Sequence, residues 1–247
     1  MEKFLILKLT LLSVLQLKVL CSSLDESKLL NAKLLKYDKR VIPKENKDTP
    51  ISVKIGFQMR YISSLDEETN TLNVEGWLLM KWKDADLQWD PEEFGGVKEL
   101  YIDSSDIWTP DIALYESSSA DNFFPRAQVK LIARNTGEVL WVPPVSFQTI
   151  CPLVPNSYEQ RCNLTLGSWV RSIRDIDVHP DPDTDPDGES FVRVHQKWEL
   201  IDVNIIRKDA IYSCCPENYP SIVHTLHFKL REARGQRSPQ VAVYCNH

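Results

Sequence analysis

Alternation of apolar and polar side chains is the dominant pattern along this chain. Over residues 51–61, every odd-numbered position is apolar or aromatic, whereas the positions between them carry polar residues or glycine. A similar alternation follows the polar stretch 63–70, over residues 71–83, and returns over residues 222–230. A period of two residues indicates strands that bury one face of a sheet.

The spacing of turns indicates how these strands are connected. Residues 128–134 and 138–142 flank an Asn-Thr-Gly turn at 135–137, which is the pattern of a β-hairpin. The chain also contains 15 prolines, and it has no internal repeat. Short strands with frequent turns predict an all-β fold, namely an antiparallel, immunoglobulin-like β-sandwich.

One helix is expected before the strands begin. Within residues 24–36, Leu29, Leu30 and Leu34 fall on a single stripe of a helix. Pro43 then ends any helical tendency. The sequence therefore predicts a sandwich preceded by one N-terminal α-helix.

The first 23 residues have the pattern of a secretory signal peptide. A lysine near the start is followed by an apolar stretch and by the small residues Ser22 and Ser23. The alternative is an N-terminal membrane anchor, but Lys8 and Lys18 interrupt the apolar run that a membrane span needs. We therefore expect a secreted, extracellular protein.

The remaining chain divides into one domain and a tail. A β-sandwich over residues 24–231 is within the usual size of a single domain. Residues 232–247 are expected to form a flexible C-terminal tail. No apolar run after the signal segment approaches the length of a membrane span, so we expect a soluble mature protein.

Charge and composition exclude several function classes. The net charge of -6, without any block of lysine or arginine, argues against a general nucleic-acid or anionic-membrane surface. No nucleophile motif or paired-carboxylate pattern stands out, and the eight glycines form no phosphate-binding loop. We therefore expect a protein that binds a ligand without catalysis and without a cofactor.

Cysteine usage fits an oxidising compartment. The six cysteines are Cys21, Cys151, Cys162, Cys214, Cys215 and Cys245. Removal of Cys21 with the signal leaves two plausible disulfides, Cys151–Cys162 and the adjacent pair Cys214–Cys215, and one cysteine in the tail. The adjacent pair has alternatives: its thiols pair elsewhere, or they form a redox couple in an extracellular disulfide oxidoreductase.

The segment around the adjacent cysteines, IYSCCPENYP (211–220), resembles the C-loop of nicotinic acetylcholine receptor alpha subunits and of the soluble acetylcholine-binding proteins. Four more segments resemble this ligand-binding domain family in the same order: KLLKYDKRVIP (33–43), WKDADLQWDP (82–91), IWTPDIALYES (107–117) and CNLTLGSWVRS (162–172). The pair Cys151 and Cys162 occupies the position of the family's Cys-loop. The resemblance extends from about residue 28 to residue 231.

The resemblance implies a two-sided site for a small cationic ligand, such as acetylcholine or a nicotine-like amine. The principal face would consist of Tyr115, Trp169, Tyr212 and Tyr219, with the disulfide Cys214–Cys215. The complementary face, from a neighbouring copy, would consist of Trp82, Ile132, Leu140 and Val142. The family also implies a homopentamer, whose pockets lie between copies. Several aromatic rings enclosing an ammonium group suit such a ligand, because cations are attracted to ring faces.

Strand phase gives a different interpretation of Trp82. This residue alternates in phase with Leu78 and Met80, which predicts a core position, and only the resemblance places it in the site. The remaining tryptophans except Trp169 are interpreted as core residues: Trp77, Trp89, Trp108, Trp141 and Trp198.

Two departures from the receptor pattern favour a soluble binding protein. The loop between Cys151 and Cys162 holds ten residues and has a polar tip. The segment after residue 231, where receptors enter a membrane helix, is polar. The competing hypothesis is a truncated nicotinic receptor subunit that acts by joining full-length partners.

Three further motifs carry weaker signals. The acidic stretch 181–189 fits an EF-hand poorly, because Val194 stands where the loop needs glutamate, so we expect a solvated loop and no metal. His224 and His227 should point to opposite faces of a strand and make poor joint ligands. Asn163 begins a glycosylation sequon, Asn-Leu-Thr.

Overall fold

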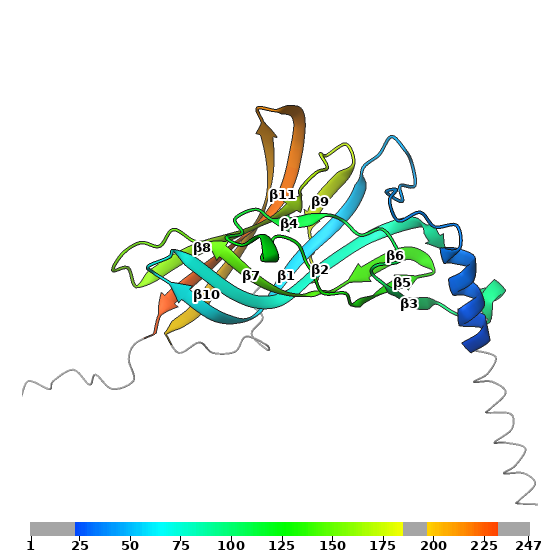
Figure 1. Cartoon of the computed structure of the whole chain (residues 1–247), viewed down its shortest axis with the longest axis horizontal. Helices are drawn as coiled ribbons and strands as arrows, with labels where there is room; N and C mark the ends of the chain where they lie inside the picture. Colours follow the sequence, from blue (N-terminus) through cyan, green and yellow to red (C-terminus); the bar gives the residue numbers. More distant parts are fainter. Residues whose placement is uncertain (1–22, 185–196, 232–247) are drawn as a thin grey trace, which may run out of the picture.

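The computed structural model describes residues 23–184 and 197–231. Most of the predicted signal segment, part of the acidic stretch 181–189, Val194 and the tail 232–247 lie outside the described residues, as do Cys21 and Cys245. The described part forms an elongated body of two sheets, with the helix at one end (Figure 1).

The larger sheet has seven strands in the order β3-β5-β6-β2-β1-β9, and β7 pairs with β2 beside this path. Its strands are β1 (Ile51–Asp66), β2 (Thr71–Gln88), β3 (Glu99–Asp103), β5 (Lys130–Arg134), β6 (Thr136–Trp141), β7 (Pro144–Ile150) and β9 (Ile176–Pro180). β1 pairs with β9 in parallel, so the predicted antiparallel sandwich has one parallel exception.

The smaller sheet has four strands in the order β10-β11-β8-β4. They are β4 (Ile112–Leu114), β8 (Glu159–Ser168), β10 (Trp198–Tyr212) and β11 (Cys215–Leu230). Two short 3-10 turns, η1 (Pro91–Phe94) and η2 (Ala120–Asn122), lie between the strands.

The core lies between the two sheets and contains the apolar positions that the alternation predicted. Ile51, Val53, Ile55, Phe57 and Met59 are all buried, and the residues between them point outward except Gly56. The predicted hairpin is confirmed as β5 and β6, and its glycine has a φ of 85° at Gly137. A positive φ of this kind favours glycine.

The N-terminal helix covers residues 23–34 and closes one end of the core. Leu29 is fully buried, and Leu30 and Leu34 pack against the same core cluster, as the stripe predicted. The sandwich with its N-terminal helix is therefore confirmed. Among the described residues, no helix combines the length and the apolar character needed to cross a membrane.

The cysteine and histidine predictions can be compared with the described residues. Cys151 and Cys162 form a disulfide. His224 is fully buried, whereas His227, three residues later, lies at the surface within 3.0 Å of the Glu159 carboxylate. The two histidines thus face opposite sides of β11, as predicted. Within the described part of the chain, no three His, Cys, Asp or Glu side chains gather as a metal site requires.

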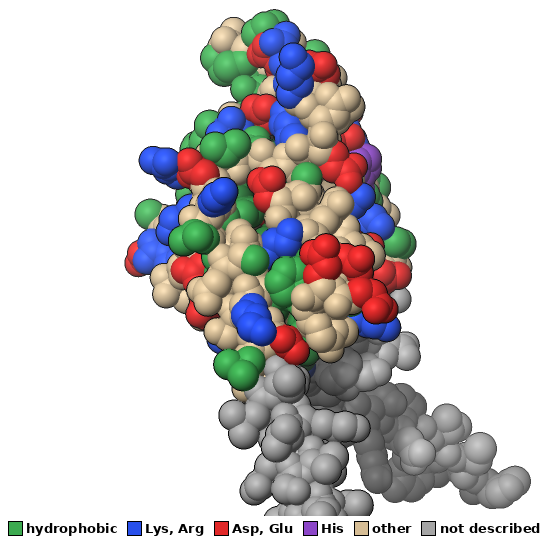
Figure 2. Space-filling view, turned by 90° about the vertical axis from the view of Figure 1, so that its right-hand side faces the viewer, with side chains coloured by type: hydrophobic (Ala, Val, Ile, Leu, Met, Phe, Trp, Pro, Cys, Tyr) green, Lys and Arg blue, Asp and Glu red, His purple; other side chains and the backbone are tan. Residues whose placement is uncertain are grey.

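The far end of the β10–β11 hairpin extends beyond the sheet. β8 pairs with β11 only from Ser221 to Lys229, so the hairpin beyond Ser221 is a two-stranded ribbon. Figure 1 shows this ribbon projecting from the body. The surface seen in Figure 2, on the side of the N-terminal helix, carries acidic and basic side chains interspersed.

Candidate functional site

An exposed tryptophan is the centre of one aromatic cluster. Trp169 directly follows β8, and 56% of its surface is exposed. Its ring meets Phe123 edge to face at 4.7 Å between centroids and Tyr115 at 6.2 Å. A large aromatic side chain that stays open to solvent while other rings hold its edges is typical of a recognition surface rather than of a core.

The Asp111 side chain fixes the loop that carries Trp169. The hydroxyl of Ser168 donates to Asp111 Oδ1 at 2.8 Å, and the N–H of Val170 donates to Asp111 Oδ2 at 2.9 Å. The N–H of Trp169 itself donates to the carbonyl oxygen of Asp111 at 3.1 Å. Because hydrogen bonds to a carboxylate are stronger than neutral ones, this arrangement holds the tryptophan in one orientation.

Tyr115 is held beneath the same loop. Its hydroxyl donates to the carbonyl oxygen of Ser168 at 2.8 Å. Burial raises the pKa of the Tyr115 phenol well above its ordinary value, so the group stays protonated. A Cβ atom on Gly167 would lie 2.5 Å from the Tyr115 oxygen, which explains why the neighbouring strand carries glycine there.

The projecting hairpin brings two more tyrosines to this cluster. Tyr212 of β10 and Tyr219 of β11 have ring centroids 5.4 Å apart. Both phenols are close enough to Tyr115 to contribute to the increase in its pKa. The four residues predicted for the principal face, Tyr115, Trp169, Tyr212 and Tyr219, are thus brought together, and Phe123 is an additional ring that the sequence did not reveal.

Two contacts connect the hairpin to the segment that follows Trp169. The N–H of Ile173 donates to the carbonyl oxygen of Asn218 at 2.9 Å, and Arg174 lies 3.2 Å from the Glu217 carboxylate. Ile173 and Arg174 follow Trp169 closely in the sequence, whereas Glu217 and Asn218 directly precede Tyr219. The two contacts therefore fix the position of Tyr219 relative to Trp169.

The adjacent cysteines are free thiols in the structure, in contrast to the predicted disulfide between Cys214 and Cys215. Cys215 is paired with Tyr212 in the strand ladder, whereas Cys214 lies in the turn. The two side chains remain in contact, and hydrogen bonding to Cys215 raises the pKa of the Cys214 thiol. A bond between neighbouring cysteines requires a distorted peptide between them, and the ladder is already irregular next to this pair, between Ile211 and Tyr212. The disulfide stays a prediction about the oxidised protein.

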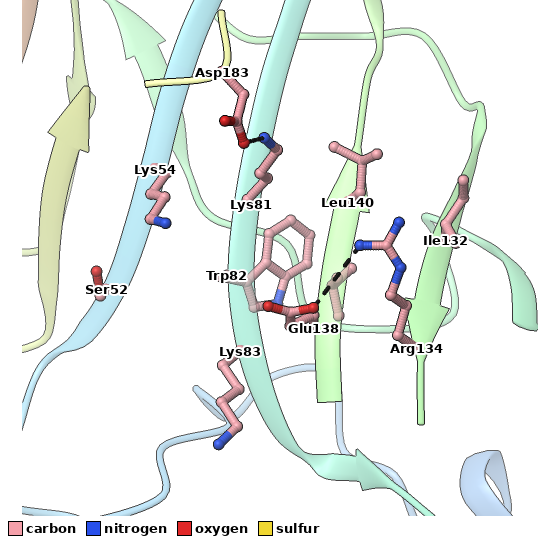
Figure 3. Close-up of a pocket in the computed structure, with 11 residues that line it drawn as sticks. Ser52, Lys54, Lys81, Trp82, Lys83, Ile132, Arg134, Glu138, Leu140 and Asp183 are labelled. Atoms are coloured by element: carbon pink, nitrogen blue, oxygen red, sulfur yellow. Dashed lines mark hydrogen bonds and ion pairs between the residues drawn. The ribbon is translucent and has the colours of Figure 1, made fainter. Parts of the chain in front are cut away.

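The residues predicted for the complementary face lie on the larger sheet. A pocket of about 510 Å³ on its outer face is lined by Ile132 and Leu140, which stand opposite each other on β5 and β6 (Figure 3). Val142, which is half-buried, directly follows β6. Charged side chains surround the pocket in ion pairs, including Lys81 with Asp183 at 2.8 Å.

Trp82 contributes to the lining of this pocket, but as a buried side chain (Figure 3). Only 4% of its surface is exposed, and its ring packs edge to face against Trp108 at 5.9 Å. Its phase on β2 is that of Leu78 and Met80, whose side chains point into the core. Little of the Trp82 ring is therefore open to a ligand, although the side chain lines the pocket.

Trp77 is the tryptophan of β2 that points outward. Trp77 pairs with Pro144 of β7, and further along β2 Met80 pairs with Trp141 of β6. Val142 lies between Trp141 and Pro144 in the sequence and is therefore near Trp77. Trp77 is half-buried and lines a surface pocket of about 450 Å³. Its interpretation as a core residue is therefore wrong, whereas the other four tryptophans interpreted as core are buried: Trp89, Trp108, Trp141 and Trp198. The signal was available in the sequence, because Trp77 alternates in phase with Lys81 and Lys83.

Asn163 is exposed on β8 and thus accessible in the folded chain. Its side-chain oxygen accepts a hydrogen bond from the Thr225 hydroxyl at 2.8 Å. Glycosylation at this sequon stays a prediction.

A family model described as the neurotransmitter-gated ion-channel ligand binding domain matches residues 26–232. The chain belongs to this family. Membership is consistent with the fold, with the Cys151–Cys162 disulfide and with the expectation of ligand binding rather than catalysis, because the family is a binding domain and not a group of enzymes.

The relatives of this ligand-binding domain include receptor alpha subunits. It is 32% identical over 216 residues to acetylcholine receptor subunit alpha-1-A of Xenopus laevis, a match that covers 86% of this chain and 46% of the relative. It is 31% identical over 230 residues to acetylcholine receptor subunit alpha of Danio rerio, covering 92% and 49%. Neuronal acetylcholine receptor subunit alpha-9-I of Oncorhynchus mykiss is 33% identical over 208 residues, covering 83% and 36%. The chain thus spans less than half the length of these relatives.

Proposed function

We propose that this ligand-binding domain acts as a secreted, soluble protein that binds acetylcholine and related organic cations. The observation that carries the proposal is the cluster around Trp169, in which an exposed indole is surrounded by other rings. An ammonium group is attracted to each ring face, by about 0.5–1 kcal/mol when exposed and about 2 kcal/mol or more when desolvated. Micromolar affinity needs about 8 kcal/mol, so a cage of several rings is required.

The second half of the proposed cage comes from a neighbouring copy. The Trp169 cluster lies at the smaller sheet, whereas Ile132, Leu140 and Val142 lie on the outer face of the larger sheet. We place Trp77 beside Leu140 and Val142 as the aromatic residue of the complementary face, in place of Trp82. The proposed assembly is a homopentamer, since a head-to-tail interface that closes into a ring brings unlike faces together at every boundary. The relatives are themselves named as receptor subunits.

Secretion is supported by two features. The N-terminal segment has the pattern of a signal peptide, and the disulfide Cys151–Cys162 is typical of oxidising compartments. The competing proposal is a truncated receptor subunit that binds only within an assembly of full-length partners. The mass of the secreted protein and its binding in the absence of any other subunit distinguish the two proposals.

Binding of labelled acetylcholine to the secreted full-length chain tests the proposed site. We expect Trp169→Ala and Trp77→Ala each to weaken binding by roughly 30-fold or more, because each removes a ring face from the cage. Tyr158→Ala is the matched control, since Tyr158 is an aromatic residue with 73% exposure near the Cys151–Cys162 disulfide, away from the cluster.

Two results would contradict the two-copy site. One is loss of binding in Trp169→Ala together with unchanged binding in Trp77→Ala. The other is full affinity in a protein that light scattering shows to be monomeric. Binding that appears only after co-expression with a full-length receptor subunit would favour the truncated-subunit proposal.

A further inference from the structure

An arginine of the same chain lies over the half-buried ring of Trp77, which we place on the complementary face. The guanidinium carbon of Arg60 lies over the Trp77 ring, 4.2 Å from its centroid. Both residues also line the pocket of about 450 Å³ on the outer face of the larger sheet. The distance is within the range in which a cation is attracted to an aromatic face.

Arg60 lies at a β-bulge of β1. Met59 pairs with Gly76 and Tyr61 pairs with Glu75, so the register between β1 and β2 shifts at Arg60. Bulges re-aim side chains and are common beside functional sites. The irregularity of the strand thus falls at the residue that contacts Trp77.

A carboxylate of the same pocket accepts two hydrogen bonds. Glu75 lines the same pocket, and its Oε1 accepts from the hydroxyls of Ser146 at 2.8 Å and Ser63 at 3.3 Å. The Arg60 guanidinium places a positive charge of the protein over the Trp77 ring. Two cations cannot occupy one ring face, because their repulsion opposes the attraction that each has for the ring.

We propose that Arg60 is an affinity-setting residue that competes with the ligand's ammonium group for the face of Trp77. This inference rests on the proposed function, since it concerns a ligand held by the complementary face. Ligand binding then requires the guanidinium to leave the ring, and the affinity for organic cations is lower than the cage alone would give. Arg60 thus lowers the affinity because it must be displaced from the ring, and it does not itself hold the ligand.

Calorimetric titration of the secreted full-length chain with acetylcholine tests this inference. Arg60→Met removes the charge and keeps an unbranched side chain that can still pack on the indole. We expect this variant to bind about two- to five-fold more tightly, the range that an exposed cation–π contact gives. Arg60→Lys keeps a cation at this position and should bind within about two-fold of the unmodified chain. Arg40→Met is the matched control, because Arg40 pairs with Asp38 on the surface and contacts no aromatic ring of the site.

The outcomes separate this inference from the proposed function. If Trp77→Ala weakens binding while Arg60→Met binds no more tightly than the unmodified chain, the competition is refuted and the proposed site stands. The competition is also refuted if Arg40→Met tightens binding as much as Arg60→Met, because the effect would then be one of net charge. If the unmodified chain binds no acetylcholine, the proposed function fails and the inference fails with it. Equal thermal unfolding midpoints for all variants would show that folding does not account for the differences.

Discussion

The buried histidine of β11 provides a prediction about stability that is independent of the ligand. His224 is fully buried, packs edge to face against Phe57 at 6.3 Å between ring centroids, and pairs with Leu164 of β8 in the ladder. Neither ring nitrogen has a hydrogen-bond partner of ordinary geometry among the described residues. Burial lowers the pKa of His224 from 6.5 to about 4, with the Leu164 backbone acting in the opposite direction.

The sign of the effect follows from where the proton binds first. As the pH falls below 6.5, the unfolded chain binds a proton at this histidine, whereas the folded chain does so only near pH 4. The contribution of His224 to the unfolding free energy is therefore complete above pH 6.5, and it is lost as the pH falls towards about 4. The difference between 6.5 and about 4 corresponds to about 3 kcal/mol of unfolding free energy.

Urea unfolding of the unmodified chain and of His224→Leu, at pH 7.5 and pH 4.5, measures this contribution. Leucine is close to histidine in volume and leaves no polar atoms buried without partners. We expect the variant to be at least as stable at pH 7.5, because an unsatisfied buried polar group costs about 1–3 kcal/mol. At pH 4.5 its advantage should grow by about 2–3 kcal/mol. An advantage that is the same at both pH values would refute the reasoning, since it would mean that His224 titrates alike in the folded and unfolded chains.

Three further predictions concern the positions of aromatic rings. Asp111→Ala should lower the unfolding free energy by about 3 kcal/mol in urea, because two hydrogen bonds to the carboxylate are lost, and it should also weaken acetylcholine binding. Trp82→Ala should destabilise the fold by about 3–5 kcal/mol, since it leaves a cavity in the core; a fully stable variant with weakened binding would instead restore Trp82 to the site. Gly167→Ala should weaken binding without preventing folding, because the added methyl group forces the Tyr115 hydroxyl away; unchanged affinity, measured by calorimetry, would contradict this.

Much of the fold was predictable from local patterns. The period of two placed the strands β1, β2 and β11, and the leucine stripe placed the helix, because both signals arise from residues that lie next to each other in the sequence. The parallel pairing of β1 with β9 was not predictable in this way. It joins Ile51 to Ile176, and nothing in either segment specifies a partner so distant.

The candidate site was predictable in composition but not in every residue. The principal face was predicted from resemblance, and its rings meet in the structure. Phe123 was missed because it follows an irregular turn, where no periodic signal exists. Trp82 was selected by resemblance against its strand phase, and the structure agrees with the phase. Phase is the more direct guide to orientation, because a shift of one residue moves a side chain to the opposite face of the sheet.

A second buried titratable group opposes the effect of His224. Asp84 is fully buried, accepts a hydrogen bond from the Tyr37 hydroxyl at 2.6 Å, and has a pKa that burial raises from 3.8 to about 6. Because the folded chain holds this proton more tightly, the contribution of Asp84 to stability is complete below about pH 4 and is lost as the pH rises towards 6. The size is again about 3 kcal/mol.

The two groups therefore have slopes of opposite sign between about pH 4 and pH 6.5, and their effects largely offset each other in the unmodified chain. Single variants should separate them. Over this window, Asp84→Asn should lose stability as the pH falls, whereas His224→Leu should gain it. The pH dependences of the two variants should thus differ by about 6 kcal/mol in urea unfolding, and every other titrating group cancels because it is common to both. Parallel pH profiles for the two variants would show that the buried environments of Asp84 and His224 do not shift their protonation as the structure requires.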